Sequence, residues 1–325
     1  MRRLAFGGIL LALFVLLGCS VGPQEYDVYV PNAGDGTITV YNTLTQQIKQ
    51  TIKVGETASH GVAVTPDNKY LYTGDLDGGN VYVIDTTSGK KIKTIEVGER
   101  THGIDISPDG KYVLVAAGRS GGPILAIIDT KTNEIVSTVT QKLEGPTHMS
   151  FSPDGKKAYI ADPVANKVIE LDMEDLSTVC AWETGSEGAQ ETTTSPDGKN
   201  LYVANYEGET VSVIDTGTGK VKSAFVTGKD THAVAVSPDG QFLWVVVQGE
   251  AKVKIYDIAN NYELVQSIDN MQLPNHIRFT PDGTKAFITE RQNNQVHIFD
   301  ANNFDELSQY EVGISPHEID FVAIK

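Results

Sequence analysis

The sequence predicts an all-β fold, a seven-bladed β-propeller of four-stranded antiparallel blades. The first observation is a stretch that runs from Thr101-His102 to Ser107-Pro108-Asp109-Gly110 and occurs seven times, the last copy being cut short by the end of the chain. The second is its spacing, because successive copies are 42, 46, 42, 42, 44 and 41 residues apart. A period in the low forties with strand-like content between the copies is typical of propeller blades.

Each copy predicts the same order of elements. An innermost strand runs into a Pro-Asp-Gly turn, and a second strand, a glycine- or asparagine-rich loop, a third strand ending in Asp and a fourth strand follow. The turn suits its residues because proline presets φ, aspartate bonds its own backbone and glycine supplies positive φ. Alternation and β-branched content predict the strands themselves, such as Leu201-Tyr202-Val203 and the strand that ends in Ile214-Asp215.

The two ends of the chain predict how the propeller closes. Before the first complete blade the sequence offers three strands, near residues 26–30, 37–41 and 51–54, and after the last copy it offers a single innermost strand. Together they make a seventh blade, and this pairing hides two strand edges that would otherwise be free. The predicted organisation is therefore a targeting segment at 1–18, a polar tether at 19–25 and one propeller at 26–325.

The first residues have the features of a secretory signal. Arg2 and Arg3 precede an apolar run, Leu4 to Leu17, that is too short to span a membrane. The run ends in Leu16-Leu17-Gly18-Cys19, which resembles the lipobox of bacterial lipoproteins. The resemblance implies that Cys19 becomes the acylated first residue and anchors the protein stably in a lipid bilayer. We therefore expect a location in the bacterial cell envelope, facing the periplasm or at the outer membrane.

The charge of the chain argues against nucleic acid as a partner. The sequence has 26 Lys and Arg against 42 Asp and Glu, and without residues 1–18, which hold two arginines and no acid, the count is 24 against 42. A surface of this sign repels phosphate backbones at long range. We expect a soluble, monomeric propeller domain that binds no nucleic acid.

The repeat itself is similar to a known family. Ser195-Pro196-Asp197-Gly198-Lys199-Asn200-Leu201-Tyr202-Val203-Ala204-Asn205, followed by Thr210-Val211-Ser212-Val213-Ile214-Asp215, resembles the YVTN-type β-propeller repeat. The resemblance covers residues 26 to 325 and implies the propeller fold. It does not imply one activity, because such propellers occur as surface proteins, as binding modules and as a few enzymes. In that family the residue after the first proline of the repeat is variable, whereas here it is nearly always histidine.

The histidines are the candidate site. Innermost strands line the central channel of a propeller, so the residue that opens each strand should lie at the channel mouth. Six of the seven histidines occupy this position, and glutamine occupies it in the remaining blade. The predicted ring is His60, His102, His148, Gln190, His232, His276 and His317. A structural interpretation is open as well, in which each imidazole bonds a backbone carbonyl or an acid and braces neighbouring blades.

If the ring is functional, imidazole chemistry indicates the ligands. Neutral imidazoles bind transition metals such as Zn, Cu, Ni or Fe, and acids on the neighbouring loops would orient them. One imidazole could instead be an axial ligand of a haem, non-covalent because the sequence has no Cys-x-x-Cys-His. Protonation below about pH 6.5 would attract a small anion. The loop residues in these roles are Asp75, Arg119, Asp162, Asn205, Glu290 and Arg291.

Two other function classes remain open. Some propellers with similar repeats are lactonases or lyases that use histidine, glutamate and arginine at the channel mouth, and Glu290 and Arg291 are compatible with acid–base work there. The third class is a protein-binding scaffold with structural histidines, in which loop residues such as Tyr206 contact an envelope protein. The sequence does not decide between a binding protein and an enzyme. Of the two, it favours the binding protein.

Overall fold

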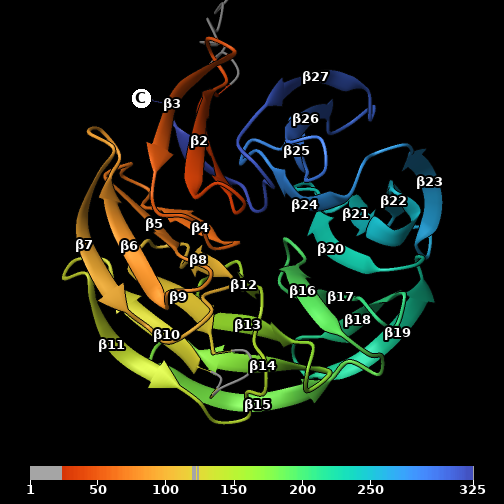
Figure 1. The fold of residues 1–325 in the computed structure, drawn as a ribbon. Helices are drawn as coiled ribbons and strands as arrows, with labels where there is room; N and C mark the ends of the chain where they lie inside the picture. The colour runs from red at the N-terminus through yellow and green to blue at the C-terminus, as the bar shows by residue number, and fades with distance from the viewer. Residues whose placement is uncertain (1–23, 119–121, 123, 325) are drawn as a thin grey trace, which may run out of the picture.

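The computed structural model describes residues 24–118, 122 and 124–324. Within them, strands form seven antiparallel four-stranded sheets arranged around one axis, which confirms the predicted seven-bladed propeller. Figure 1 shows the innermost strands gathered around the centre and the fourth strands at the rim. A single turn of 3-10 helix, η1 at Gln248–Glu250, interrupts the strands, and no helix in the described part of the chain is long and apolar enough to cross a membrane.

The strands fall into four classes by their place in a blade. The innermost strands are β4 (Val62–Val64), β8 (Ile104–Ile106), β12 (Met149–Phe151), β16 (Ala189–Thr194), β20 (Thr231–Val236), β24 (Pro274–Phe279) and β28 (Asp320–Ala323). The second strands are β5 (Tyr70–Gly74), β9 (Tyr112–Ala117), β13 (Lys157–Asp162), β17 (Asn200–Asn205), β21 (Phe242–Val247), β25 (Lys285–Glu290) and β1 (Tyr26–Asn32). The third strands are β6 (Asn80–Asp85), β10 (Ile124–Asp129), β14 (Lys167–Asp172), β18 (Thr210–Asp215), β22 (Lys252–Asp257), β26 (Gln295–Asp300) and β2 (Thr37–Asn42). The fourth strands are β7 (Lys90–Glu96), β11 (Glu134–Val139), β15 (Ser177–Glu183), β19 (Lys220–Val226), β23 (Glu263–Ile268), β27 (Glu306–Glu311) and β3 (Gln47–Lys53).

The Pro-Asp-Gly turns join first and second strands as the sequence predicts. In the second blade, the Ser107 hydroxyl donates to Asp109 Oδ1 at 2.6 Å, and the Gly110 amide donates to the Ser107 carbonyl at 2.7 Å. Gly110 has φ of 71°, a conformation that glycine adopts without steric cost. The turn therefore fixes the direction in which each innermost strand leaves the channel.

Closure of the ring uses both ends of the chain, as predicted. The strand order in the closing blade is β28-β1-β2-β3, and Tyr26, Val28 and Tyr29 of β1 pair with residues 320–323 of β28. The Ile324 amide adds a hydrogen bond of 2.8 Å to the Glu25 carbonyl. Because β1 is covered on both sides, no free edge is left between the first and last segments of the propeller.

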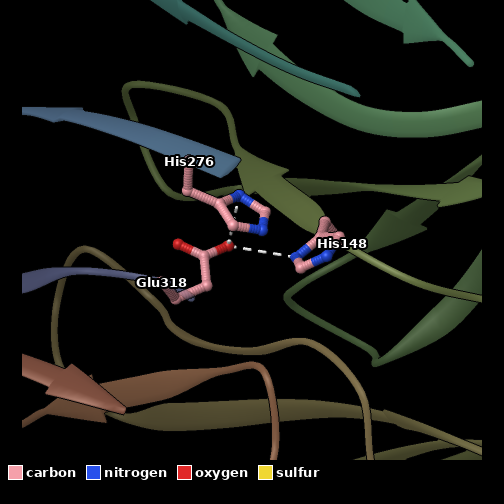
Figure 2. Close-up of side chains that lie close together, drawn as sticks. All are labelled: His148, His276 and Glu318. Atoms are coloured by element: carbon pink, nitrogen blue, oxygen red, sulfur yellow. Dashed lines mark ion pairs between the residues drawn. The ribbon is translucent and has the colours of Figure 1, made fainter. Parts of the chain in front are cut away.

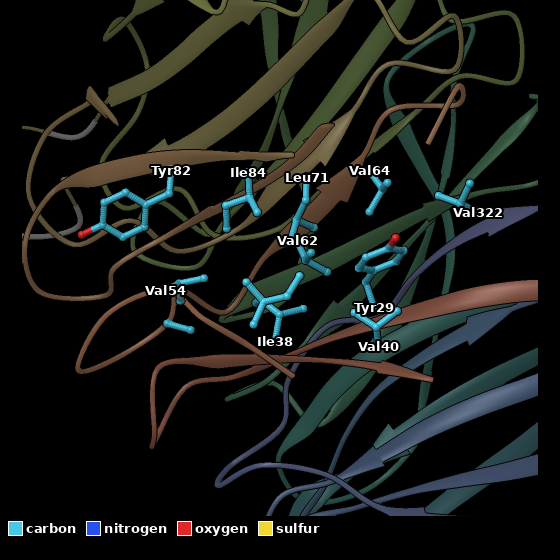
Figure 3. Close-up of a cluster of buried hydrophobic side chains, with 12 residues drawn as sticks. Tyr29, Ile38, Val40, Val54, Val62, Val64, Leu71, Tyr82, Ile84 and Val322 are labelled. Carbon is cyan, nitrogen blue, oxygen red and sulfur yellow. The ribbon is translucent and has the colours of Figure 1, made fainter. Parts of the chain in front are cut away.

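The hydrophobic core lies between blades rather than inside any one of them. Figure 3 shows the cluster that joins the closing blade to the next one, with Ile38 and Val40 of β2 facing Leu71 and Ile84 of β5 and β6. All four of these side chains are at most 1% exposed. Each sheet thus buries both of its faces against its neighbours, which holds the innermost strands at fixed positions around the axis.

Candidate histidine and carboxylate centre in the channel

The six ring histidines meet at the axis of the propeller. Their imidazoles touch in the order His317, His60, His102, His148, His276 and His232, with successive ring centroids 3.8, 4.4, 4.8, 4.6 and 5.1 Å apart. His276 also lies 6.4 Å from His317, which closes five of the rings into a circle. Side chains separated by up to 257 positions (317 minus 60) therefore form one cluster.

The cluster is largely closed to solvent. His276, His317 and His148 are 0%, 1% and 2% exposed, whereas His60 and His232 are partly exposed. Nε2 of His148, of His276 and of His317 is buried without a hydrogen-bond partner among the described residues. The other nitrogen, Nδ1, is the one through which His148 and His276 contact carboxylates.

In three blades, at Gln190, His232 and His276, a β-bulge holds the ring residue. In β20, Thr231 and Ala233 pair with Val247 and Val246, which leaves His232 between them as an extra residue. In β24, Asn275 and His276 together face the single residue Thr289. Such a bulge interrupts the alternation of side chains and redirects one of them. The imidazole can therefore enter the channel while its neighbours stay in the core.

Backbone hydrogen bonds and imidazole contacts both join adjacent blades at the ring. The Gly61 amide donates to the His102 carbonyl at 3.0 Å, and the Glu318 amide donates to the His60 carbonyl at 3.2 Å. The blades approach so closely here that a Cβ on Gly61 would lie 2.1 Å from the Ile104 nitrogen. The imidazoles add to these bonds, because His60 Nδ1 lies 3.0 Å from His102 Nε2 and His232 Nδ1 donates to the Asn275 carbonyl at 3.2 Å. The structural interpretation of the histidines therefore stays open beside the functional one.

Gln190 differs from the other ring positions. It occupies the bulge of β16, and its carbonyl accepts a hydrogen bond from the Thr147 hydroxyl at 2.8 Å. The chain of imidazole contacts bypasses it, because His148 packs directly on His276. Gln190 is buried and occupies in its blade the bulge position that His232 occupies in the next one.

Glu318 joins the histidines to the interior of the channel. Figure 2 shows its carboxylate between the imidazoles of His148 and His276. Glu318 Oε1 lies 3.0 Å from His148 Nδ1 and 3.6 Å from His276 Nδ1, and its Oε2 lies 3.4 Å from Arg278 Nε. Burial alone would raise the pKa of Glu318, but His276, Arg278 and His148 outweigh it and hold the pKa well below its usual range. The carboxylate is thus ionised.

A second carboxylate faces the same imidazole. Glu191 Oε2 lies 3.0 Å from His276 Nδ1, and both side chains are buried. Two sets of three side chains bring their donor atoms within 4.8 Å of one another and could hold a metal ion. They are His148, His276 and Glu318, called the inner set here, and Glu191, His232 and His276, called the outer set.

Further along the channel lies a group of charged residues on the innermost strands. Arg278 Nη2 is 3.7 Å from Asp105 Oδ2, and Asp320 Oδ2 accepts from the Val64 amide at 2.7 Å. Burial raises the pKa of Asp105 to about 6 although Arg278 opposes the shift. Burial and the nearby Asp105 raise the pKa of Asp320 to about 7. Arg278 is therefore the one guanidinium that the structure places among four channel carboxylates, namely Asp105, Glu191, Glu318 and Asp320.

The pKa values of the ring imidazoles shift in different directions. Burial and the neighbouring rings lower the pKa of His232 and of His317 well below its ordinary value. Burial also lowers the pKa of His276, but Glu318 and Glu191 reverse this and the net shift is upward. Burial and crowding therefore favour the neutral form of His232 and His317, whereas the carboxylates favour the protonated form of His276.

The predicted loop residues Asp75, Asp162, Glu290 and Asn205 have partners other than the ring imidazoles. Asp75 accepts from the Tyr82 hydroxyl at 2.5 Å, and Asp162 accepts from backbone amides of residues 144, 145 and 165. Glu290 lies 3.2 Å from Nε2 of His297, the histidine outside the ring, and Asn205 donates to the Ser212 hydroxyl at 2.9 Å. Each of these side chains holds a loop or strand of its own region. The acids that contact the ring imidazoles are Glu191 and Glu318.

Two mouth residues fit the prediction better. Arg291 donates to the Ser315 hydroxyl at 3.0 Å, and its charge helps to lower the pKa of His317. The Tyr206 ring lies 6.0 Å from that of His232. Both therefore stand beside the cluster. Arg119 and Cys19, which were predicted as a mouth residue and as the lipidation site, lie outside the described residues.

The sequence carried a signal for the carboxylates that was not used. Innermost strands of a propeller are apolar or small for the most part, and an ionisable residue within one must enter the channel or remain buried without a partner. Five such residues occur in these strands or directly before them: Asp105, Glu191, Arg278, Glu318 and Asp320. A search for charged residues within three positions of each ring residue would have found all five.

Comparison with known proteins agrees with the fold. The model of the family described as lactonase, 7-bladed beta-propeller, matches residues 20–213 and 172–318. The chain belongs to this family. A curated relative, antigen Lp49 of Leptospira interrogans, is 30% identical over 109 residues, which are 29% of this chain and 24% of that protein. The match thus spans about a quarter of the length of the relative.

Solved structures share the architecture at low sequence identity. Kuenenia stuttgartiensis hydrazine synthase has a TM-score of 0.76 and 22% identity, with 90% of this chain and all of that chain covered. A putative 6-phosphogluconolactonase from Bacteroides uniformis has a TM-score of 0.74 and 16% identity, with 92% of this chain and all of that chain covered. The dihydro-heme d1 dehydrogenase NirN has a TM-score of 0.69 and 16% identity, with 92% of this chain and 75% of that chain covered. These likenesses show the fold alone.

The raised pKa of Asp105 predicts how stability depends on pH. The folded protein keeps this proton up to about pH 6, whereas the unfolded chain releases it near 3.8, so the group makes folding less favourable as pH rises between these values. We expect Asp105→Asn to gain about 3 kcal/mol of unfolding free energy relative to wild type between pH 4 and pH 7. Denaturant unfolding at several pH values measures this, and a constant difference between the two proteins would contradict the assignment.

Proposed function

We propose that the protein binds a divalent transition-metal ion in its channel through His148, His276 and Glu318. The observation that carries the proposal is the spacing of the donor atoms, 3.0 and 3.6 Å from Glu318 Oε1 to the two Nδ1 atoms. Ligands about 2.1 Å from a tetrahedral Zn²⁺ lie about 3.4 Å from one another. The inner set therefore needs little rearrangement to receive an ion.

The charge of the channel supports a cation. The ionised carboxylate of Glu318 lies with Glu191, Asp105 and Asp320 around one guanidinium, that of Arg278, although the raised pKa values of Asp105 and Asp320 reduce the negative charge near neutral pH. Unpaired buried charge is costly, and a divalent ion bound beside Glu318 would offset it. The donor chemistry narrows the choice of ion, because imidazole with carboxylate suits Zn, Cu, Ni or Fe better than the harder Ca or Mg. Three protein ligands also leave one position of a tetrahedral ion open for water or for a ligand.

A haem would need a different position. The imidazoles pack with centroids 3.8 to 5.1 Å apart, which leaves no space for a macrocycle between them. Such a group would have to lie over the mouth, with partly exposed His60 or His232 as its ligand. A small anionic ligand would likewise meet Arg291 at the mouth. The metal ion is favoured because it alone uses the buried carboxylates.

Metal binding is tested with purified protein and Co²⁺ or Zn²⁺. We expect one equivalent to bind, and His148→Ala and Glu318→Gln each to weaken binding by about two orders of magnitude, since each loses a ligand. His60→Ala is the matched control, a ring histidine outside both sets, and should bind almost as wild type does. Calorimetry and the Co²⁺ visible spectrum measure the affinity, and circular dichroism checks folding.

The proposal fails if wild-type protein binds neither ion, or if the control loses as much affinity as the two ligand variants. Protein purified from its own envelope with a Soret band and no stoichiometric metal ion would favour the haem alternative instead.

A second candidate is hydrolysis of a lactone, which membership of the lactonase propeller family supports. Two histidines and a glutamate form a donor set that occurs in catalytic zinc sites, where the remaining position holds a water. In the reaction, water adds to the lactone carbonyl, the ring C–O bond breaks, and the product is a hydroxy acid. Tyr206, Arg291 and His232 stand at the mouth through which such a substrate would enter.

The enzyme candidate predicts turnover that depends on the inner set. We expect a panel of five- and six-membered lactones to include at least one that metal-loaded protein opens, and His148→Ala to lower kcat by about 100-fold or more. Product acid is followed by pH-stat titration. Stoichiometric metal binding without turnover of any lactone would leave the binding protein as the function.

We also propose that the protein is anchored in the bacterial cell envelope through an acylated Cys19, on the support of the lipobox-like sequence. In a bacterial host, labelled palmitate should enter wild-type protein and Cys180→Ser protein, and the chain should fractionate with membranes. Cys19→Ser should abolish labelling, because the remaining cysteine lies in β15 and is no acylation site. Labelling of the Cys19→Ser variant would contradict the anchor.

A further inference from the structure

The outer set, Glu191, His232 and His276, is a second place where a metal ion could bind. It shares His276 with the inner set. His276 presents the same nitrogen, Nδ1, to Glu191 at 3.0 Å and to Glu318 at 3.6 Å. One lone pair binds one ion at a time, so the two sets are alternative positions of a single ion along the channel.

His232 is prepared to act as a ligand. Its Nδ1 donates to the Asn275 carbonyl at 3.2 Å, which fixes the proton on Nδ1 and leaves the lone pair on Nε2. An imidazole whose other nitrogen is held by a backbone carbonyl is the usual arrangement of a metal-binding histidine.

The two sets differ in their access to solvent. All three residues of the inner set are buried, whereas His232 in the outer set is partly exposed and faces Tyr206 at the mouth. Of the five residues in the two sets, His232 is the one that is not buried, so an ion entering from solvent on this side would meet the outer set first. His276 contacts both acids, so the ion can pass between the sets without losing this ligand.

We infer that the outer set captures the metal ion at the mouth and delivers it to the inner set, which holds it. The inference rests on the proposed metal binding. A capture site lowers the barrier to binding and to release alike and leaves the final affinity unchanged. His232 then sets the rates of binding and release of the ion, whereas His148 and Glu318 set the affinity.

The test is stopped-flow binding and chelator-driven release of Co²⁺, with calorimetry for the dissociation constant. We expect His232→Ala to slow association and release by the same factor, about tenfold or more, with Kd within about twofold of wild type. His232→Gln serves as the second variant if the alanine protein folds poorly. His60→Ala, the other partly exposed ring histidine, is the control and should have wild-type rates.

Three results would overturn the inference. Unchanged rates in the His232 variants would show that the ion takes another route. A weaker Kd with unchanged association would make His232 a ligand of the bound ion rather than a capture residue. Failure of wild-type protein to bind Co²⁺ would overturn the proposed function together with the inference, whereas the first two results leave the metal site intact.

Discussion

The β-bulges at the start of β20 and β24 are the constraint on which the positions of His232 and His276 in the channel depend. Each blade places its first strand beside the axis, but alternation alone would send only every second side chain into the channel. The extra residue at the bulge, seen at His232 and at His276, breaks this rule. Backbone hydrogen bonds between neighbouring blades, such as that from the Gly61 amide to the His102 carbonyl, fix the blades around the axis. The imidazoles add their own contacts between blades, since His60 Nδ1 lies 3.0 Å from His102 Nε2 and His232 Nδ1 donates to the Asn275 carbonyl.

The acids give this cluster its chemical character. A ring of neutral imidazoles alone would be a polar plug in the channel, with several buried nitrogens lacking partners. Glu318 and Glu191 add negative charge beside His276, and Arg278 compensates only part of it. The same contacts that raise the pKa of His276 leave His232 and His317 neutral. Imidazole, carboxylate and excess negative charge together define a site for a divalent cation more closely than any one residue does.

Much of the fold and part of the site follow from the sequence. The period of the Pro-Asp-Gly turns predicts the blades, and the incomplete sets of strands at the two ends predict the closing blade. The meeting of the histidines follows from the same period, because equivalent positions of a propeller share one radius. The partners of the imidazoles did not follow, since the bulge changes which face the next residue takes. The loop acids such as Asp75 and Asp162 instead satisfy backbone and hydroxyl groups of their own turns.

The central claim is that His148, His276 and Glu318 coordinate a metal ion directly. X-ray absorption spectroscopy of the Zn²⁺- or Co²⁺-loaded protein tests it most directly, because the outer-ring scattering of coordinated imidazole identifies histidine ligands. The account predicts a first shell of nitrogen and oxygen at about 2.0–2.1 Å with two imidazoles. A shell of oxygen atoms without imidazole scattering would show that the ion binds elsewhere and would contradict the account.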